Sequence, residues 1–209
     1  MAWAASDRPD VAMAPATRTA PLILLAIAAL ASVLHDAGAA AYLAMPLWLW
    51  RVSASGRLLA LGLGTPISRA ALGAGALIGS ALGTHLLVAA SMTLGYRPRV
   101  MEAAVARGVA YDLGAQVLAT ECFFRGALFN RAQRRWSFGA AAALSTVACL
   151  GRYLIDPRLP GSAEILCGMV FYITLLSLAN CWLFWRFGSL VPGMLSALLF
   201  FAAYRMIAE

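Results

Sequence analysis

The stretch most informative about the fold is TECFFRG, residues 120–126, which places two charged side chains inside an apolar run. Glu121 and Arg125 are four residues apart, so on an α-helix they share one face and lie close enough to form an ion pair. An unpaired charge inside a membrane segment is costly, and charges kept there commonly mark a functional site. This pair is therefore the first candidate site in the chain.

The composition around this stretch is that of a membrane protein. Of the 209 residues, 62% are apolar and 12% are charged, whereas soluble domains carry about 25% charged residues. Several apolar runs reach the ~20 residues that a helix needs to cross a ~30 Å hydrocarbon core. The sequence thus predicts an all-α fold, a polytopic membrane helix bundle with about six transmembrane helices.

Short segments rich in arginine, proline and glycine separate the predicted spans. The spans cover approximately residues 21–45, 70–94, 111–129, 138–155, 165–184 and 190–207. We expect residues 1–19, which contain four charges and two prolines, to form a flexible or partner-bound tail. Residues 20–209 then form a single transmembrane domain. In the second span, Gly75, Gly79 and Gly83 recur every four residues, a pattern that lets membrane helices pack closely.

The charge pattern points to lipid as a partner. All sixteen basic residues are arginines, and the net charge is +7. The arginines are scattered through the short loops rather than clustered on one face, which fits membrane topology and anionic headgroups rather than nucleic acid. The numbers of arginines on the two sides of the membrane are nearly equal. The positive-inside rule therefore leaves the membrane orientation open.

The remaining polar and sulfur-containing groups predict no cofactor and no metal. The cysteines lie in apolar segments without CxxC spacing, at Cys122, Cys149, Cys167 and Cys181, which indicates neither a zinc cluster nor a disulfide framework. We expect His85 to form a hydrogen bond across helices. His35 and Asp36 form either a polar packing site or a proton-relay or ligand pair. A metal site built from the two histidines and a cysteine or Glu121 is the alternative.

Two segments resemble one family of membrane proteins. The stretch ECFFRGAL, residues 121–128, is similar to the EExxFRGxL motif of the CPBP family, the CAAX-protease and bacteriocin-processing (ABI) intramembrane proteases. The stretch GSLVPGMLSA, residues 188–197, resembles the GSLxxPxxxHA segment of that family, and LGLG at residues 61–64 is weakly similar. The resemblance covers about residues 58–205 and implies a helical membrane fold built for peptide-bond cleavage.

Most catalytic positions of that family hold other residues here. Family enzymes use two adjacent glutamates, the histidine of FxxxH, and the histidine and asparagine of HxxxN. A glutamate takes a proton from water, and the other groups orient that water and stabilise the oxyanion. Glu121 and Arg125 are retained. The degenerate motif positions are Thr120, Cys149, Tyr153, Ser196 and Phe200, and a shift of one residue places Arg152 at the first histidine position.

The sequence therefore predicts a non-catalytic, CPBP-like integral membrane protein. We expect a pseudoenzyme that serves as a subunit, scaffold or assembly factor of a larger complex, with other integral membrane proteins as partners. Glu121 and Arg125 are then structural, with Tyr153 and Arg152 filling the former water pocket and bonding Glu121. The alternative is an intramembrane endopeptidase of the CPBP type with a divergent active site that uses Glu121. The expected location is the bacterial inner (cytoplasmic) membrane.

Overall fold

The computed structural model describes residues 62–63, 66–96, 112, 117–154 and 162–208. This part of the chain is a bundle of helices without a strand, as the sequence predicted. The tail predicted at residues 1–19, the span predicted at residues 21–45, and the pair His35 and Asp36 lie outside the described residues.

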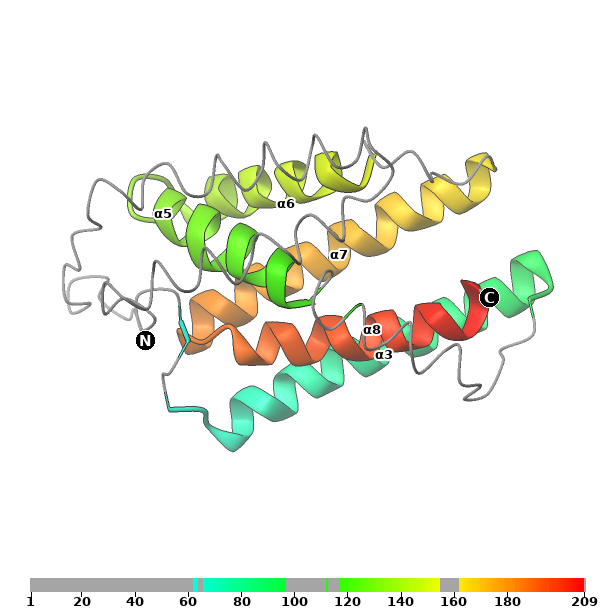
Figure 1. The fold of residues 1–209 in the computed structure, drawn as a ribbon, viewed down its shortest axis with the longest axis horizontal. Helices are drawn as coiled ribbons and strands as arrows, with labels where there is room; N and C mark the ends of the chain where they lie inside the picture. The colour runs from blue at the N-terminus through cyan, green and yellow to red at the C-terminus, as the bar shows by residue number, and fades with distance from the viewer. Residues whose placement is uncertain (1–61, 64–65, 97–111, 113–116, 155–161, 209) are drawn as a thin grey trace.

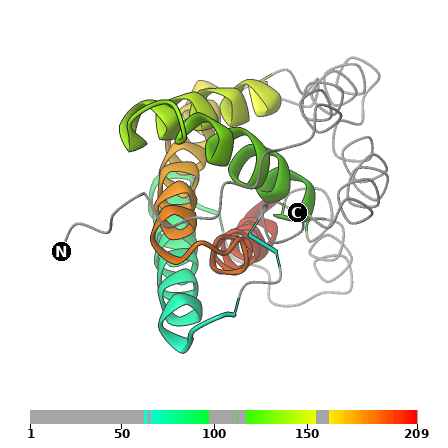
Figure 2. The ribbon, with the colours of Figure 1, turned by 90° about the vertical axis from the view of Figure 1, so that its left-hand side faces the viewer.

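The helices run along one long axis in alternating directions (Figures 1 and 2). The elements are α3 (Arg69–Leu94), the π-helix η3 (Glu121–Phe129), α5 (Asn130–Ala132), α6 (Phe138–Leu154), α7 (Ala163–Phe187) and α8 (Val191–Ala208). In Figure 1, the starts of α3, α6 and α8 lie at the same end of the bundle as α5 and the end of α7. The turn between α5 and α6 and the turn between α7 and α8 therefore lie at the same end.

Four helices coincide with predicted spans, and η3 occupies the end of the span predicted at residues 111–129. Both α3 and α7 are long and apolar enough to cross a membrane, whereas α6 and α8 are shorter apolar helices. The total of six transmembrane helices stays a prediction.

Local sequence explains where the two longest helices begin and end. Ser68 precedes α3, and its hydroxyl accepts a hydrogen bond from the backbone N–H of Ala71 at 3.1 Å. Ser162 caps α7 in the same way, because serine oxygens satisfy free N–H groups of the first turn. Gly95 and Gly188 end the two helices with φ angles of 68° and 66°, a left-handed conformation that favours glycine.

The glycine repeat of the second predicted span forms the contact between α3 and α8. Gly75 lies against the backbone of Pro192, and Gly79 lies against the backbone of Ser196. A Cβ atom added to either glycine would overlap that backbone. Gly83 continues the same buried face one turn later. The predicted close packing by small residues is thus confirmed.

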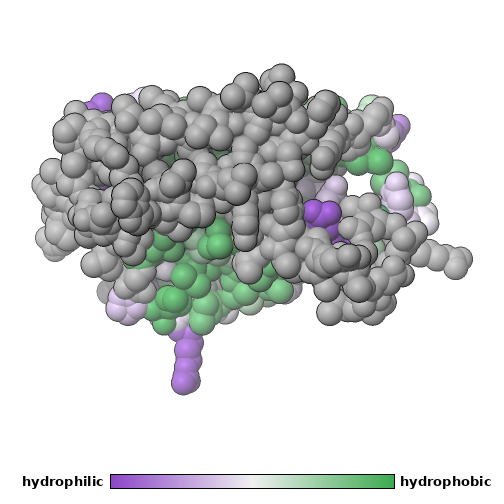
Figure 3. All heavy atoms as spheres, viewed as in Figure 1, coloured by the Kyte–Doolittle hydropathy of each residue, from purple (hydrophilic) through white to green (hydrophobic). Residues whose placement is uncertain are grey.

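Apolar side chains fill the bundle and also cover its outer face. One buried cluster surrounds Phe129 and Phe184, and a second surrounds Phe124 and Phe200. On the outside, Met92 of α3 exposes 82% of its surface. Where described atoms are visible in Figure 3, hydrophobic residues predominate. Helices that are apolar on the inside and the outside are typical of a membrane environment.

Candidate functional site

The charged pair of the sequence motif lies on the π-helix η3. Arg125 Nη1 is 3.5 Å from Glu121 Oε1, so the predicted ion pair forms. The segment was expected to be α-helical, but residues 121–129 adopt the wider π-helical winding with i→i+5 bonding. Short π-helical segments within helices frequently occur at functional sites.

The carboxylate of Glu121 is enclosed by α7 and the first turn of α8. Asn180 of α7 donates a hydrogen bond from Nδ2 to Glu121 Oε1 at 2.9 Å and a second bond to the carbonyl of Gly193 at 3.2 Å. A Cβ atom at Gly193 would lie 3.2 Å from Glu121 Oε2. Glycine at this position therefore avoids a tight contact with the carboxylate. Glu121 is 2% exposed.

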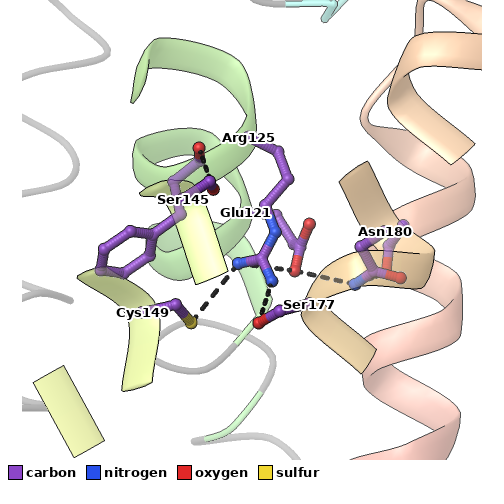
Figure 4. Close-up of polar contacts among 8 residues, drawn as sticks. Glu121, Arg125, Ser145, Cys149, Ser177 and Asn180 are labelled. Atoms are coloured by element: carbon purple, nitrogen blue, oxygen red, sulfur yellow. Dashed lines mark hydrogen bonds and ion pairs between the residues drawn. The ribbon is translucent and has the colours of Figure 1, made fainter. Parts of the chain in front are cut away.

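The guanidinium of Arg125 connects η3 to two further helices (Figure 4). Its Nη2 donates to the hydroxyl of Ser177 on α7 at 2.7 Å, and its Nη1 donates to Cys149 Sγ on α6 at 3.6 Å. Arg125 is 1% exposed. Ser145 adds a link from α6 to η3 by donating to the backbone carbonyl of Phe124 at 2.9 Å. The pair is therefore the polar centre around which η3, α6 and α7 assemble.

Five buried polar atoms, three of them on Glu121, Arg125 and Asn180, have no hydrogen-bond partner in the described part of the chain. They are Glu121 Oε2, Arg125 Nε, Thr146 Oγ1, Asn180 Oδ1 and Ser196 Oγ. Nearly all buried polar atoms in proteins are hydrogen-bonded, so such a group of exceptions marks a place with unused capacity to bind water or a small polar group.

Three of the degenerate motif residues are buried in the bundle. Cys149 contacts Arg125 directly, as described above. Ser196 is fully buried on α8, where its backbone packs against Gly79. Thr120 is buried directly before η3.

The other degenerate positions make different contacts. Phe200 packs against the ring of Tyr172, with 5.9 Å between ring centroids. The guanidinium of Arg152 lies over the ring of Tyr153, 4.6 Å from its centroid. The hydrogen bond to Glu121 comes from Asn180, and Tyr153 lies close enough to Glu121 and Arg125 to interact electrostatically with both. Asn180 is a partner of Glu121 that the sequence did not indicate, and the expected bond from Tyr153 or Arg152 to Glu121 stays a prediction.

His85 has the cross-helix bond that the sequence predicted. Its Nδ1 is 2.7 Å from the hydroxyl of Tyr172 on α7. Tyr172 precedes Asn180 by eight residues, about 12 Å along a helix axis, so this bond is remote from Glu121. No group of three histidine, cysteine or acidic side chains within the described ranges is arranged to hold a metal.

The sequence analysis missed three residues that hold this region together. Ser177 and Asn180 are polar residues three positions apart within an apolar span, a spacing that places both on one helix face. That isolated polar face was the available signal. Asp112, 1% exposed, accepts two hydrogen bonds from Arg205 at 2.7 and 2.9 Å, which ties the chain before η3 to the end of α8.

Comparison with known proteins adds a family assignment to this geometry. The family model described as type II CAAX prenyl endopeptidase, Rce1-like, matches residues 102–202. The matched region contains η3, α6, α7 and most of α8, and with them every residue that contacts the charged pair. Neither a search of curated proteins nor a search of solved structures found a match to the chain.

Proposed function

Because the model of the Rce1-like CAAX prenyl endopeptidases matches residues 102–202, we propose that this protein keeps the helical scaffold of that family without its catalysis. In this proposal it acts as a subunit, scaffold or assembly factor of a larger complex in a bacterial inner membrane. The observation that supports the proposal is that Asn180 and Arg125 both contact Oε1 of Glu121.

A catalytic glutamate must take a proton from a water molecule that other groups orient. Here Glu121 Oε1 accepts a hydrogen bond from Asn180 and faces the guanidinium of Arg125. Protonation would neutralise the carboxylate and leave the buried guanidinium without its counter-charge, which opposes action as a base. The positions that orient water in the family hold Tyr153 and Ser196 in place of histidine.

The same contacts suit a structural role. Glu121 and Arg125 connect η3 to α7, and Arg125 also reaches α6. A polar centre of this kind fixes how helices pack where apolar contacts alone are non-directional. The apolar outer faces of α3 and α7 then remain for contact with lipids and with other integral membrane proteins.

The test is co-purification of the tagged, full-length protein from its own membrane in mild detergent. The informative variant is Glu121→Gln with Arg125→Met. Gln keeps an acceptor for Asn180, and Met removes the cation, so no buried charge is left unpaired. We expect a membrane protein to co-purify in a fixed ratio with both the wild type and this variant. The absence of any such protein from the wild-type sample would refute the proposal.

A second candidate is an intramembrane endopeptidase that uses Glu121 as its base. The observation that favours it is that Oε2 of Glu121 and Oδ1 of its neighbour Asn180 are both buried without a hydrogen-bond partner among the described residues. A water molecule with such neighbours would be held near a carboxylate. In that case a membrane substrate accumulates uncleaved in cells that carry the Glu121→Gln, Arg125→Met variant, and proteomics of the membrane fraction detects it.

A further inference from the structure

One end of the bundle carries a surface that the charged pair and its role leave unexplained. Two segments far apart in the sequence form it, the turn between α5 and α6 and the last turn of α7. The residues of this basic–aromatic patch are Arg134, Arg135, Trp136, Phe138, Trp185 and Arg186. Figure 2, which views the bundle from this end, shows the two segments at the same end.

A ring contact joins the two segments. The rings of Phe138 and Trp185 lie 5.4 Å apart, centroid to centroid, at an interplanar angle of 52°. The contact brings the turn that carries Arg135 and Trp136 next to the last turn of α7, which carries Arg186. The turn itself is ordered by backbone hydrogen bonds, including one from Arg135 N–H to the carbonyl of Ala132 at 3.0 Å.

The side chains of the patch are exposed at the end of apolar helices. Trp136 and Trp185 expose 54% and 48% of their surface, and Arg135 and Arg186 are exposed as well. Tryptophan at the end of a membrane helix lies at the level of the lipid headgroups, where its ring contacts apolar chains and its N–H contacts polar groups. The patch thus sits where a phosphate group of a lipid lies.

Among the residues that the structure describes, the charged side chains at this end are all basic. The acidic residues that the structure describes lie elsewhere: Glu121 is in the core, Asp112 pairs with Arg205 near the end of α8, and Glu164 is in the first turn of α7. The guanidinium group binds phosphate through two parallel N–H bonds, which a lysine cannot provide. Basic groups between membrane helices bind the headgroups of anionic lipids.

We propose that the basic–aromatic patch is a binding site for the phosphate headgroup of an anionic phospholipid. Arg135 of the turn before α6 and Arg186 of α7 bind the phosphate, and Trp136 and Trp185 position the glycerol and upper acyl region. The site differs from general attraction to a charged surface because it depends on these two arginines. It stands independently of whether the protein is catalytic.

The experiment measures binding of short-chain dioctanoyl phosphatidylglycerol to the full-length protein in neutral detergent. Dioctanoyl phosphatidylcholine and inorganic phosphate are the comparison ligands. The test variant carries both Arg135→Gln and Arg186→Gln. The control variant is Arg69→Gln, because Arg69 is exposed at the same end of the bundle but belongs to α3. These surface changes leave stability within about 0.5 kcal/mol, so all variants remain folded.

We expect saturable binding of phosphatidylglycerol and none of phosphatidylcholine. Since an arginine near a membrane surface contributes about a five-fold gain in affinity for anionic lipid, the double variant loses roughly 25-fold. The Arg69→Gln control changes affinity less than about two-fold. An equal loss in the control would show general electrostatic attraction and overturn the site. Equal binding of phosphatidylcholine, or full competition by inorganic phosphate, would overturn it as well.

Discussion

Asn180 holds the carboxylate of Glu121 by a 2.9 Å hydrogen bond between residues 59 positions apart in the chain. The same amide nitrogen also donates to the carbonyl of Gly193, so one side chain joins η3, α7 and α8. Through this bond, the buried carboxylate of Glu121 is part of the packed core.

The charged pair should behave as a unit in stability measurements. Glu121→Gln alone leaves a buried guanidinium without a counter-charge, and we expect it to lower the free energy of unfolding by about 3–5 kcal/mol. Adding Arg125→Met removes that charge and should recover most of the loss. Thermal unfolding in detergent provides the measurement. If the double variant is no more stable than Glu121→Gln alone, the pair is not coupled in this way.

A side chain at Gly193 should destabilise the protein, because its Cβ would lie 3.2 Å from Glu121 Oε2. We expect Gly193→Ala to cost about 1–3 kcal/mol, since the added Cβ presses on Oε2 and forces the carboxylate to shift. The matched control is Gly168→Ala on α7, where an added Cβ meets no atom within 4 Å. Equal unfolding midpoints for the two variants would contradict the enclosure of the carboxylate.

The contact between α3 and α8 should depend on Gly79 and not on Gly73. A Cβ at Gly79 overlaps the backbone of Ser196, which cannot move as a side chain can, so Gly79→Ala should lower stability by at least about 1–3 kcal/mol. Gly73 lies on the exposed face of the same helix with open space around it. We therefore expect Gly73→Ala to change stability by less than about 1 kcal/mol. The two variants are compared by thermal unfolding.

The bond between Asp112 and Arg205 should require the planar fork of arginine. Arg205→Lys keeps the charge but loses one of the two parallel hydrogen bonds to the carboxylate. Because the guanidinium is partly exposed, we expect a loss of only about 1 kcal/mol. Asp112→Asn removes the buried charge itself and should also destabilise the protein. A Lys variant with unchanged thermal stability would show that the two-bond geometry contributes nothing.

The hydrogen bond between His85 and Tyr172 should contribute modestly. Tyr172→Phe removes the hydroxyl and keeps the ring against Phe200, so we expect a loss of about 0.5–1.5 kcal/mol. Tyr96→Phe, at an exposed position after α3, is the control. In a protein that already carries His85→Ala, Tyr172→Phe should cause no further loss of stability. Thermal unfolding of the single and double variants measures this.

The sequence was sufficient for the features that depend on local pattern. Apolar runs predicted where α3, α6, α7 and α8 lie, the glycine repeat predicted a close helix contact, and the four-residue spacing predicted the ion pair. The motif around Glu121 indicated the family whose model matches residues 102–202. Each of these follows from neighbours along one helix.

The remaining features depend on contacts between distant segments. Nothing local to Asn180 or Ser177 says that they meet Glu121 and Arg125, since that requires knowing how α7 packs against η3. The π-helical winding of η3 was not predicted because the same residues also suit an α-helix. Asp112 and Arg205 are likewise joined only by the folded bundle.

The most direct test concerns water at the carboxylate. Asn130 and Asn180 are the only asparagines in the chain, so protein labelled selectively with ¹⁵N-asparagine gives just two side-chain amide signals. Solid-state NMR of the protein in lipid measures the transfer of magnetisation from water to these amides. The spectrum of the Asn180→Asp variant identifies which signal belongs to Asn180. Our account predicts that the Asn180 amide receives little magnetisation from water and exchanges slowly with D₂O. Rapid transfer and exchange at Asn180 would place mobile water beside Glu121, and would contradict the structural role in favour of catalysis.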